Sequence, residues 1–153
     1  MFRLSARADP AFLAEMLYEI AYWHDDGEEE RPPLEKLLTE PVHARFVEGW
    51  GRTGDVAVLA LDRRDEPIGA AWCRRFTATE MRIAVFPEFR RQGVGSLLLG
   101  SLLARARAGG EAALEVEVVP DNPARRFLGA RGFTDTADRP SVLVCVLDAE
   151  LMR

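Results

Sequence analysis

Apolar residues near the start of the chain recur at the spacing of one helical face. After a predicted strand over residues 2–7, the pair Asp9-Pro10 offers an N-cap and a first-turn proline. The apolar positions that follow lie three or four residues apart and predict an amphipathic helix that ends near Trp23. They are Phe12, Leu13, Met16, Leu17 and Ile20.

Further along the chain, apolar residues follow the two-residue period of strands or form short apolar runs between turns. In order, we expect short helices over 34–38 and 42–50, strands over 56–61, 68–73 and 79–86, a leucine-rich helix ending at Gly109, a strand over 114–118, a short helix from Asn122 to Gly132, a short strand from Phe133 and a last strand over 142–147. Strands mixed with helices in this way predict an α/β (α+β) protein built on a central sheet.

Length and charge narrow the class of protein. A chain of 153 residues predicts one domain spanning residues 1–153. The net charge of -5 argues against a nucleic-acid surface and favours a cationic small molecule as partner. The first residues are too short and too mixed for a signal peptide, and no apolar run approaches a membrane span. We therefore expect a cytoplasmic protein that binds neither nucleic acid nor membrane.

Cysteine and histidine usage offers little chemistry. Cys73 and Cys145 lie in apolar stretches without a CxxC pair, which predicts buried, reduced thiols. His24 and His43 are the only histidines and form no helical pair, so we expect no metal site.

The turn that follows the third long strand carries the clearest functional signal. Gly93 and Gly95 allow positive φ and a close approach of the backbone to a ligand. The first turn of the next helix has unpaired N–H groups with partial positive charge, and Arg90 and Arg91 add fixed charge. The Ser96 hydroxyl can donate to a phosphate oxygen. The pattern favours a phosphate site over an ordinary helix start.

Two other phosphate-binding motifs do not match the sequence of this turn and helix. A dinucleotide-binding turn needs a third glycine where this chain has Leu98, which argues against an oxidoreductase. Gly95 and Gly100 have Walker A spacing, but Ser101 stands where the lysine is required.

Together the motifs resemble the GCN5-related N-acetyltransferase (GNAT) superfamily. The acyl-CoA signature of that family is Arg or Gln, two residues, Gly, one residue, then Gly or Ala, and Arg90, Gly93 and Gly95 match it directly after a strand. A second motif, a strand followed by Asn, a short helix and Gly-Phe, matches Asn122 and the pair Gly132-Phe133.

The resemblance implies an acyl-CoA N-acyltransferase fold. That fold has a central mixed, mostly antiparallel sheet of six to seven strands, splayed in the middle and flanked by about four helices. It implies acetyl-CoA (coenzyme A) as cofactor, with the pantetheine arm in the splay and the pyrophosphate on the turn. The implied cofactor-binding residues are Ile83, Ala84, Val85, Arg90, Arg91, Gln92, Gly93, Val94, Gly95, Ser96, Asn122 and Phe127.

The resemblance gives a candidate base and leaves the acid open. Glu80 begins the strand beside the expected slot, where relatives often carry a catalytic glutamate, although a solvated strand-end carboxylate explains it as well. Many relatives have a tyrosine acid where this chain has Leu128. Water can protonate a leaving thiolate whose pKa is about 8.5, so turnover does not require that tyrosine.

The acceptor is less defined. The acidic loop after the first helix can recognise a cationic acceptor through Asp25 and Asp26, with Tyr22, Trp23 and Trp72 as aromatic walls, or it is merely solvated. The expected function is acetyl transfer from acetyl-CoA to a primary amine of a small molecule or peptide, by direct attack in a ternary complex. The alternative is a non-catalytic acyl-CoA-binding or sensor domain. The resemblance also allows a homodimer.

Overall fold

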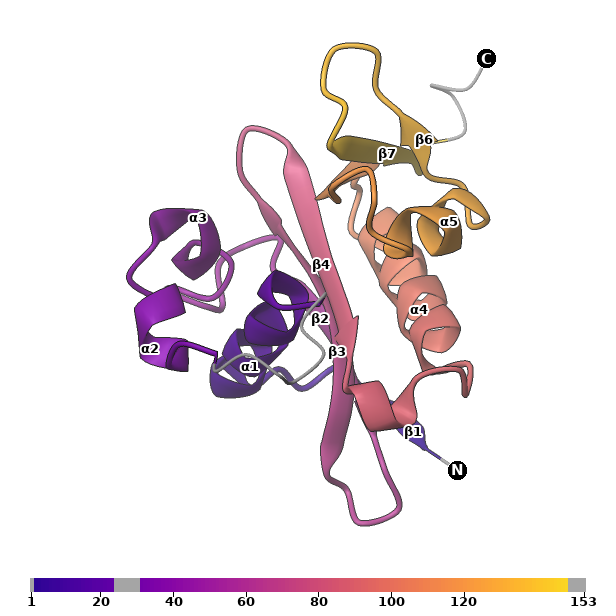
Figure 1. The fold of residues 1–153 in the computed structure, drawn as a ribbon. Helices are drawn as coiled ribbons and strands as arrows, with labels where there is room; N and C mark the ends of the chain where they lie inside the picture. Colours follow the sequence, from indigo (N-terminus) through magenta and orange to yellow (C-terminus); the bar gives the residue numbers. More distant parts are fainter. Residues whose placement is uncertain (1, 24–30, 149–153) are drawn as a thin grey trace.

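A seven-stranded sheet forms the centre of the computed structural model, which describes residues 2–23 and 31–148 (Figure 1). The strand order is β1-β2-β3-β4-β5-β7-β6. The strands are β1 (Arg3–Ser5), β2 (Val56–Leu61), β3 (Pro67–Arg75), β4 (Thr79–Val85), β5 (Ala113–Glu117), β6 (Thr134–Asp135) and β7 (Val142–Val146). The helices are α1 (Pro10–Ala21), α2 (Leu34–Leu37), α3 (Pro41–Ala44), the 3-10 helix η1 (Pro87–Phe89), α4 (Val94–Ala108) and α5 (Ala124–Gly129).

This architecture confirms the predicted fold class. The sheet is mixed and mostly antiparallel, because β4 and β5 are its one parallel pair among the described strands. The described residues form five α-helices where about four were expected. No helix in this part of the chain has both the length and the apolar composition that crossing a membrane requires.

Each face of the sheet carries its own hydrophobic cluster. Figure 1 shows α1, α2 and α3 on one side of the sheet and α4 and α5 on the other. The α1 helix starts as predicted, since the Asp9 carboxylate accepts from Ala11 N at 3.0 Å with Pro10 in the first turn. Its buried Leu13 and Met16 belong to a cluster that includes Trp72.

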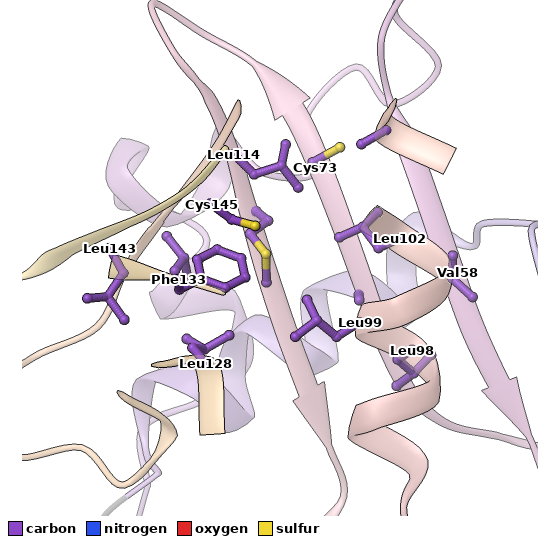
Figure 2. Close-up of a cluster of buried hydrophobic side chains, with 14 of the residues drawn as sticks. Val58, Cys73, Leu98, Leu99, Leu102, Leu114, Leu128, Phe133, Leu143 and Cys145 are labelled. Carbon is purple, nitrogen blue, oxygen red and sulfur yellow. The ribbon is translucent and has the colours of Figure 1, made fainter. Parts of the chain in front are cut away.

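The opposite face is filled by the leucines of α4. Figure 2 shows Leu98, Leu99 and Leu102 on this helix beside the strands, and all three belong to the same buried cluster as Cys73. Cys73 and Cys145 are buried and unbridged, as predicted. Burial, assisted by the carboxylates of Glu111 and Asp55, raises the pKa of the Cys73 thiol to about 12, so it stays protonated at neutral pH.

The sheet separates between β4 and β5. β4 is paired with β3 along its whole length, from Gly69↔Val85 to Arg75↔Thr79. β4 and β5 share only the pair Glu80↔Glu115, at the start of β4. Beyond that pair, β5 follows β7 instead. The splay implied by the family resemblance is therefore present, and it leaves strand backbone facing a gap.

The second predicted short helix is shorter in the structure, and a buried arginine holds the segment that follows it. We expected a helix over 42–50, but α3 ends at Ala44. The Arg74 guanidinium, 1% exposed, donates to the carbonyls of Arg45, Glu48 and Gly49 at 2.9, 2.5 and 3.2 Å. The chain continues in turns as far as Glu48, and the positive φ of Gly49 (61°) then ends the helical path. A buried ion pair from Arg74 to Asp55 at 3.0 Å completes the anchor.

We predict that Arg74→Met lowers the free energy of unfolding by about 3–5 kcal/mol, because it leaves the Asp55 carboxylate buried and unpaired. Urea unfolding monitored by circular dichroism measures this. The matched control is Arg3→Gln, which breaks an ion pair to Asp65 whose side chains are 61% and 66% exposed. The control should cost less than about 1 kcal/mol. Equal losses in the two variants would contradict the anchor.

Candidate active site: a cleft where the sheet separates

A cleft of about 850 Å³ lies where β4 and β5 part. It passes between the strands and reaches both faces of the sheet. On the α1 face the lining consists of Glu19, Ile20 and Trp23; between the strands, of 82–85 and 116–118; on the α4 face, of 89–91, 93–96, 122–124, Phe127, Leu128 and Arg131. One cavity thus connects two chemically different ends.

The end at the start of α4 is built to hold an anion. Gly93 is the N-cap of α4 with φ 80°, and Arg91, two residues earlier, also has a positive φ of 64°. A Cβ at Gly93 would meet no atom within 4 Å, so the backbone there faces open space. The first turn of α4 contains no acidic residue. Its N–H groups and partial positive charge are directed at the cleft, which is the arrangement that phosphate requires.

Gly95 has a different role from the predicted one. We expected positive φ at both glycines, but only Gly93 has it. Gly95 lies inside α4, where a Cβ would stand 3.4 Å from the Phe127 ring. The position needs a small residue because α5 packs closely against α4 there.

Three arginines surround this end of the cleft. Arg90 and Arg91 both line it, and Arg90 Nε donates to Val85 O at 3.3 Å. Sequence reasoning missed Arg131, whose guanidinium stacks 4.0 Å from the Phe127 ring centroid and donates to Ser96 Oγ at 2.6 Å. Nothing in the local sequence singles out Arg131, because the fold brings it to α4 from a distant position.

Most of the implied cofactor-binding residues lie in this cleft. Residues 83–85, Asn122 and Phe127 line it, in addition to the turn. Gln92 does not, and its side chain approaches Glu88 O at 3.5 Å. Asn122 Oδ1 accepts from Ala124 N, at the start of α5, at 2.9 Å, and Asn122 also belongs to the lining of the cleft.

Glu80 is placed differently from what a base requires. It does not line the cleft, and its two carboxylate oxygens accept from the two terminal nitrogens of Arg45 at 3.0 Å each. Both oxygens of this carboxylate are occupied by the guanidinium of Arg45, so neither is directed at an acceptor in the cleft. The geometry therefore argues against the predicted role of Glu80 as general base.

Two other carboxylates lie nearer the site. Glu117 ends β5 and lines the cleft, with an exposed side chain. Glu19 lines it from α1, 15% exposed, and pairs with Arg31 at 3.3 Å. Sequence reasoning missed both because Glu117 looks like any polar residue of an alternating strand and Glu19 like any polar residue of an amphipathic helix.

The residues predicted to bind the acceptor do not lie together in the structure. Trp23 lines the cleft, whereas Tyr22 does not. Trp72 is fully buried and donates from its indole N–H to Phe46 O at 3.1 Å, so the prediction that it forms a wall for the acceptor is wrong. Asp25 and Asp26 lie outside the described residues.

The position of the missing tyrosine is apolar. Leu128 lines the cleft and is 1% exposed, packed in the α4-side cluster. Tyr18, one of the two tyrosines, donates its hydroxyl to Pro32 O at 2.5 Å and does not line the cleft. Within the described part of the lining, no tyrosine is available as an acid.

Comparison with known proteins agrees with this geometry. The model of the acetyltransferase (GNAT) family matches residues 15–133, most of the chain, and the chain therefore belongs to that family. A search among curated proteins finds no match. Members of the family use acetyl-CoA, and the turn described above fits its pyrophosphate.

Solved structures with this fold share little sequence with the chain. PaiA N-acetyltransferase from Thermoplasma acidophilum, in complex with coenzyme A, is 17% identical over 95% of this chain and 99% of that chain, with a TM-score of 0.72. A GNAT-family acetyltransferase from Staphylococcus aureus Mu50 is 15% identical over 97% and 100%, with a TM-score of 0.67. The ribosomal-protein-S18-alanine N-acetyltransferase from Escherichia coli is 18% identical over 97% and 95%, with a TM-score of 0.66.

We predict that Gly93→Asp weakens coenzyme A binding at least about 100-fold, because a carboxylate at the N-cap of α4 repels the pyrophosphate. Isothermal calorimetry measures the affinity. Gly93→Asn is the matched control, because asparagine has nearly the same size as aspartate and meets the same positive φ at this position but carries no charge. The asparagine variant should bind coenzyme A more tightly than the aspartate variant. Wild-type affinity in a folded Gly93→Asp protein would contradict the phosphate site.

Proposed function

We propose that the chain, as one domain over residues 1–153, is an acetyl-CoA-dependent N-acetyltransferase that acetylates a primary amine of a small molecule or peptide. The observation that carries this proposal is the cleft through the sheet. Its α4 end combines a helix N-terminus with Arg90, Arg91 and Arg131, and its opposite end carries the exposed carboxylate of Glu117, while Glu19 there is paired with Arg31. A cleft of this polarity suits an anionic donor on one side and a cationic acceptor on the other.

Binding and orientation follow from the residues at the α4 end. Backbone N–H groups of 94–96 and the flanking guanidinium groups hold the pyrophosphate without competing acidic side chains. The β4 backbone at 83–85, which has no register partner on β5, supplies hydrogen bonds to the pantetheine arm across the gap. When bound, acetyl-CoA supplies a thioester whose acetyl group an uncharged amine can attack.

Proton transfer is assigned to Glu117. An amine reaches the site as an ammonium ion and must lose a proton before it can act as a nucleophile. Glu117 lines the cleft at the end of β5, and no hydrogen bond within the described chain occupies its carboxylate. It accepts the proton directly or through a water molecule. Direct attack in a ternary complex then needs no covalent enzyme intermediate.

The leaving thiolate needs no dedicated acid. A thiol with a pKa of about 8.5 leaves readily and is protonated by water. The apolar Leu128 at the wall of the cleft is consistent with this route. The same observation is also the best support for the second candidate, an acyl-CoA-binding or sensor domain of the same fold that does not catalyse transfer.

We predict that acetyl-CoA binds with micromolar affinity and that NADH, the control ligand, does not bind. Calorimetry measures both. Thiol release across a panel of primary amines then separates the two candidates. Saturable coenzyme A production with any acceptor excludes the sensor, whereas tight acetyl-CoA binding without turnover on any amine supports it. Absence of acetyl-CoA binding would refute both.

The two glutamates can be distinguished by matched substitutions. We predict that Glu117→Gln lowers kcat about 100-fold, within the range of general-base catalysis, with the affinity for acetyl-CoA nearly unchanged. Glu80→Gln should act mainly on stability, through the lost ion pair with Arg45. Steady-state kinetics with parallel urea unfolding measures both effects. A large fall in kcat for Glu80→Gln alone would return the base role to Glu80.

A further inference from the structure

Arg82 is a buried cation in the wall of the cleft. The residue is 8% exposed, yet it belongs to the lining where β4 and β5 part. Burying a guanidinium costs free energy unless an anion and hydrogen bonds compensate for lost water. The contacts of Arg82 therefore decide what the cleft can bind.

The protein compensates for this charge only in part. One terminal nitrogen donates to Met81 O at 2.8 Å, and the guanidinium lies 3.9 Å from the Phe46 ring centroid. Among the described residues, no carboxylate oxygen lies within 4.0 Å of it. Glu80, a neighbour of the right charge, is engaged by Arg45. Several N–H donors of a group that prefers planar, two-pronged partners remain available.

The pKa of Arg82 shows the same imbalance. Burial lowers it to about 10, and the positive charge of Arg45 contributes to the lowering, while Glu117 and Glu80 oppose it. The side chain still carries its positive charge at neutral pH. An anion that enters the cleft would relieve this cost.

Arg82 lies on the acceptor side of the sheet. Met81 belongs to the α4-side cluster, and Phe46, which stacks on Arg82, belongs to the α1-side cluster. Side chains of a strand alternate between faces, so Arg82 is directed away from the phosphate end. The anion it accepts is therefore part of the acceptor and not a phosphate of coenzyme A.

Glu117 lies across the gap from Arg82 on the same face. The parallel pair Glu80↔Glu115 places the residues two further along, Arg82 and Glu117, opposite one another as the strands diverge. Their side chains are too far apart for an ion pair within 4.0 Å, which leaves room for a ligand between a fixed positive and a fixed negative charge. An ammonium ion suits Glu117 and a carboxylate suits Arg82.

We infer that the acceptor carries a carboxylate close to its reactive amine, as a free amino acid does, and that Arg82 binds this carboxylate. The inference rests on the proposed function and names its substrate class. A polyamine would bring a second positive charge to Arg82, where repulsion would disfavour it. Arg82 is thus a substrate-binding residue that determines specificity.

The test compares acceptors that differ only in the anion. Thiol release is measured with acetyl-CoA and the standard amino acids, each beside its carboxamide and its decarboxylated amine. We expect kcat/KM for the best amino acid to exceed that of its carboxamide at least about tenfold, mainly through a lower KM. A factor of this size is what one charge-assisted hydrogen-bonded pair contributes. Calorimetry of the same amino acid and carboxamide on coenzyme A-loaded protein should show the same order of affinity.

Substitutions assign the preference to Arg82. Arg82→Met should bring the acid-to-amide ratio of kcat/KM close to one, and Arg82→Lys should keep part of that ratio. Arg105→Gln, an exposed change on α4 with the same loss of charge, should leave the ratio unchanged. Acetyl-CoA affinity, measured for every variant, verifies that the Arg82 proteins are folded.

The outcomes separate this inference from the proposed function. If wild-type protein binds acetyl-CoA and acetylates amides or decarboxylated amines as well as acids, or if the ratio survives Arg82→Met, only the inference is overturned. If acetyl-CoA binds and no amino acid is acetylated, the inference is also overturned. If acetyl-CoA does not bind at all, the proposed function and the inference fall together.

Discussion

The separation of β4 from β5 is the constraint on which the site depends. In a sheet, the backbone N–H and C=O groups of a strand normally bond to the neighbouring strands. Between β4 and β5 this pairing stops after Glu80↔Glu115. Because β5 is fully paired with β7 on its other side, it can diverge without losing its own support. The resulting gap connects the two faces of the sheet, so groups on opposite faces line one cleft. A continuous sheet would have kept them apart.

The two faces contribute opposite chemistry because different segments cover them. The α4 face presents a helix N-terminus, whose N-cap Gly93 has the positive φ that keeps the backbone open to a ligand. The α1 face is closed by the segment after α3, which Arg74 and Asp55 fix to β3. That segment carries Arg45, which binds Glu80, and Phe46, which supports Arg82. A structural anchor thus decides which charged groups remain available in the cleft.

Local pattern predicted most of the helices and strands well. The helix that became α1 follows from spacing, because one buried face imposes its period on the sequence. The strands β2 and β3 follow from short apolar runs between turns, because both of their faces are buried. The turn at Arg90 to Ser96 is also local, since a helix N-terminus and its glycine N-cap lie within a few residues. Gly95 shows the limit: its small size serves a contact with Phe127, which is distant in sequence.

The sequence by itself determined the order of elements, the family resemblance and the glycine turn proposed to bind the pyrophosphate, because each is encoded over short stretches. Only the tertiary structure decided the roles of single charged residues. Glu80, Arg82 and Glu117 all look like ordinary polar strand positions, yet the fold pairs the first with Arg45, buries the second and leaves the third at the cleft. The reason is physical: the chemistry of a charge depends on its burial and its partners, and those come from residues far away in the chain.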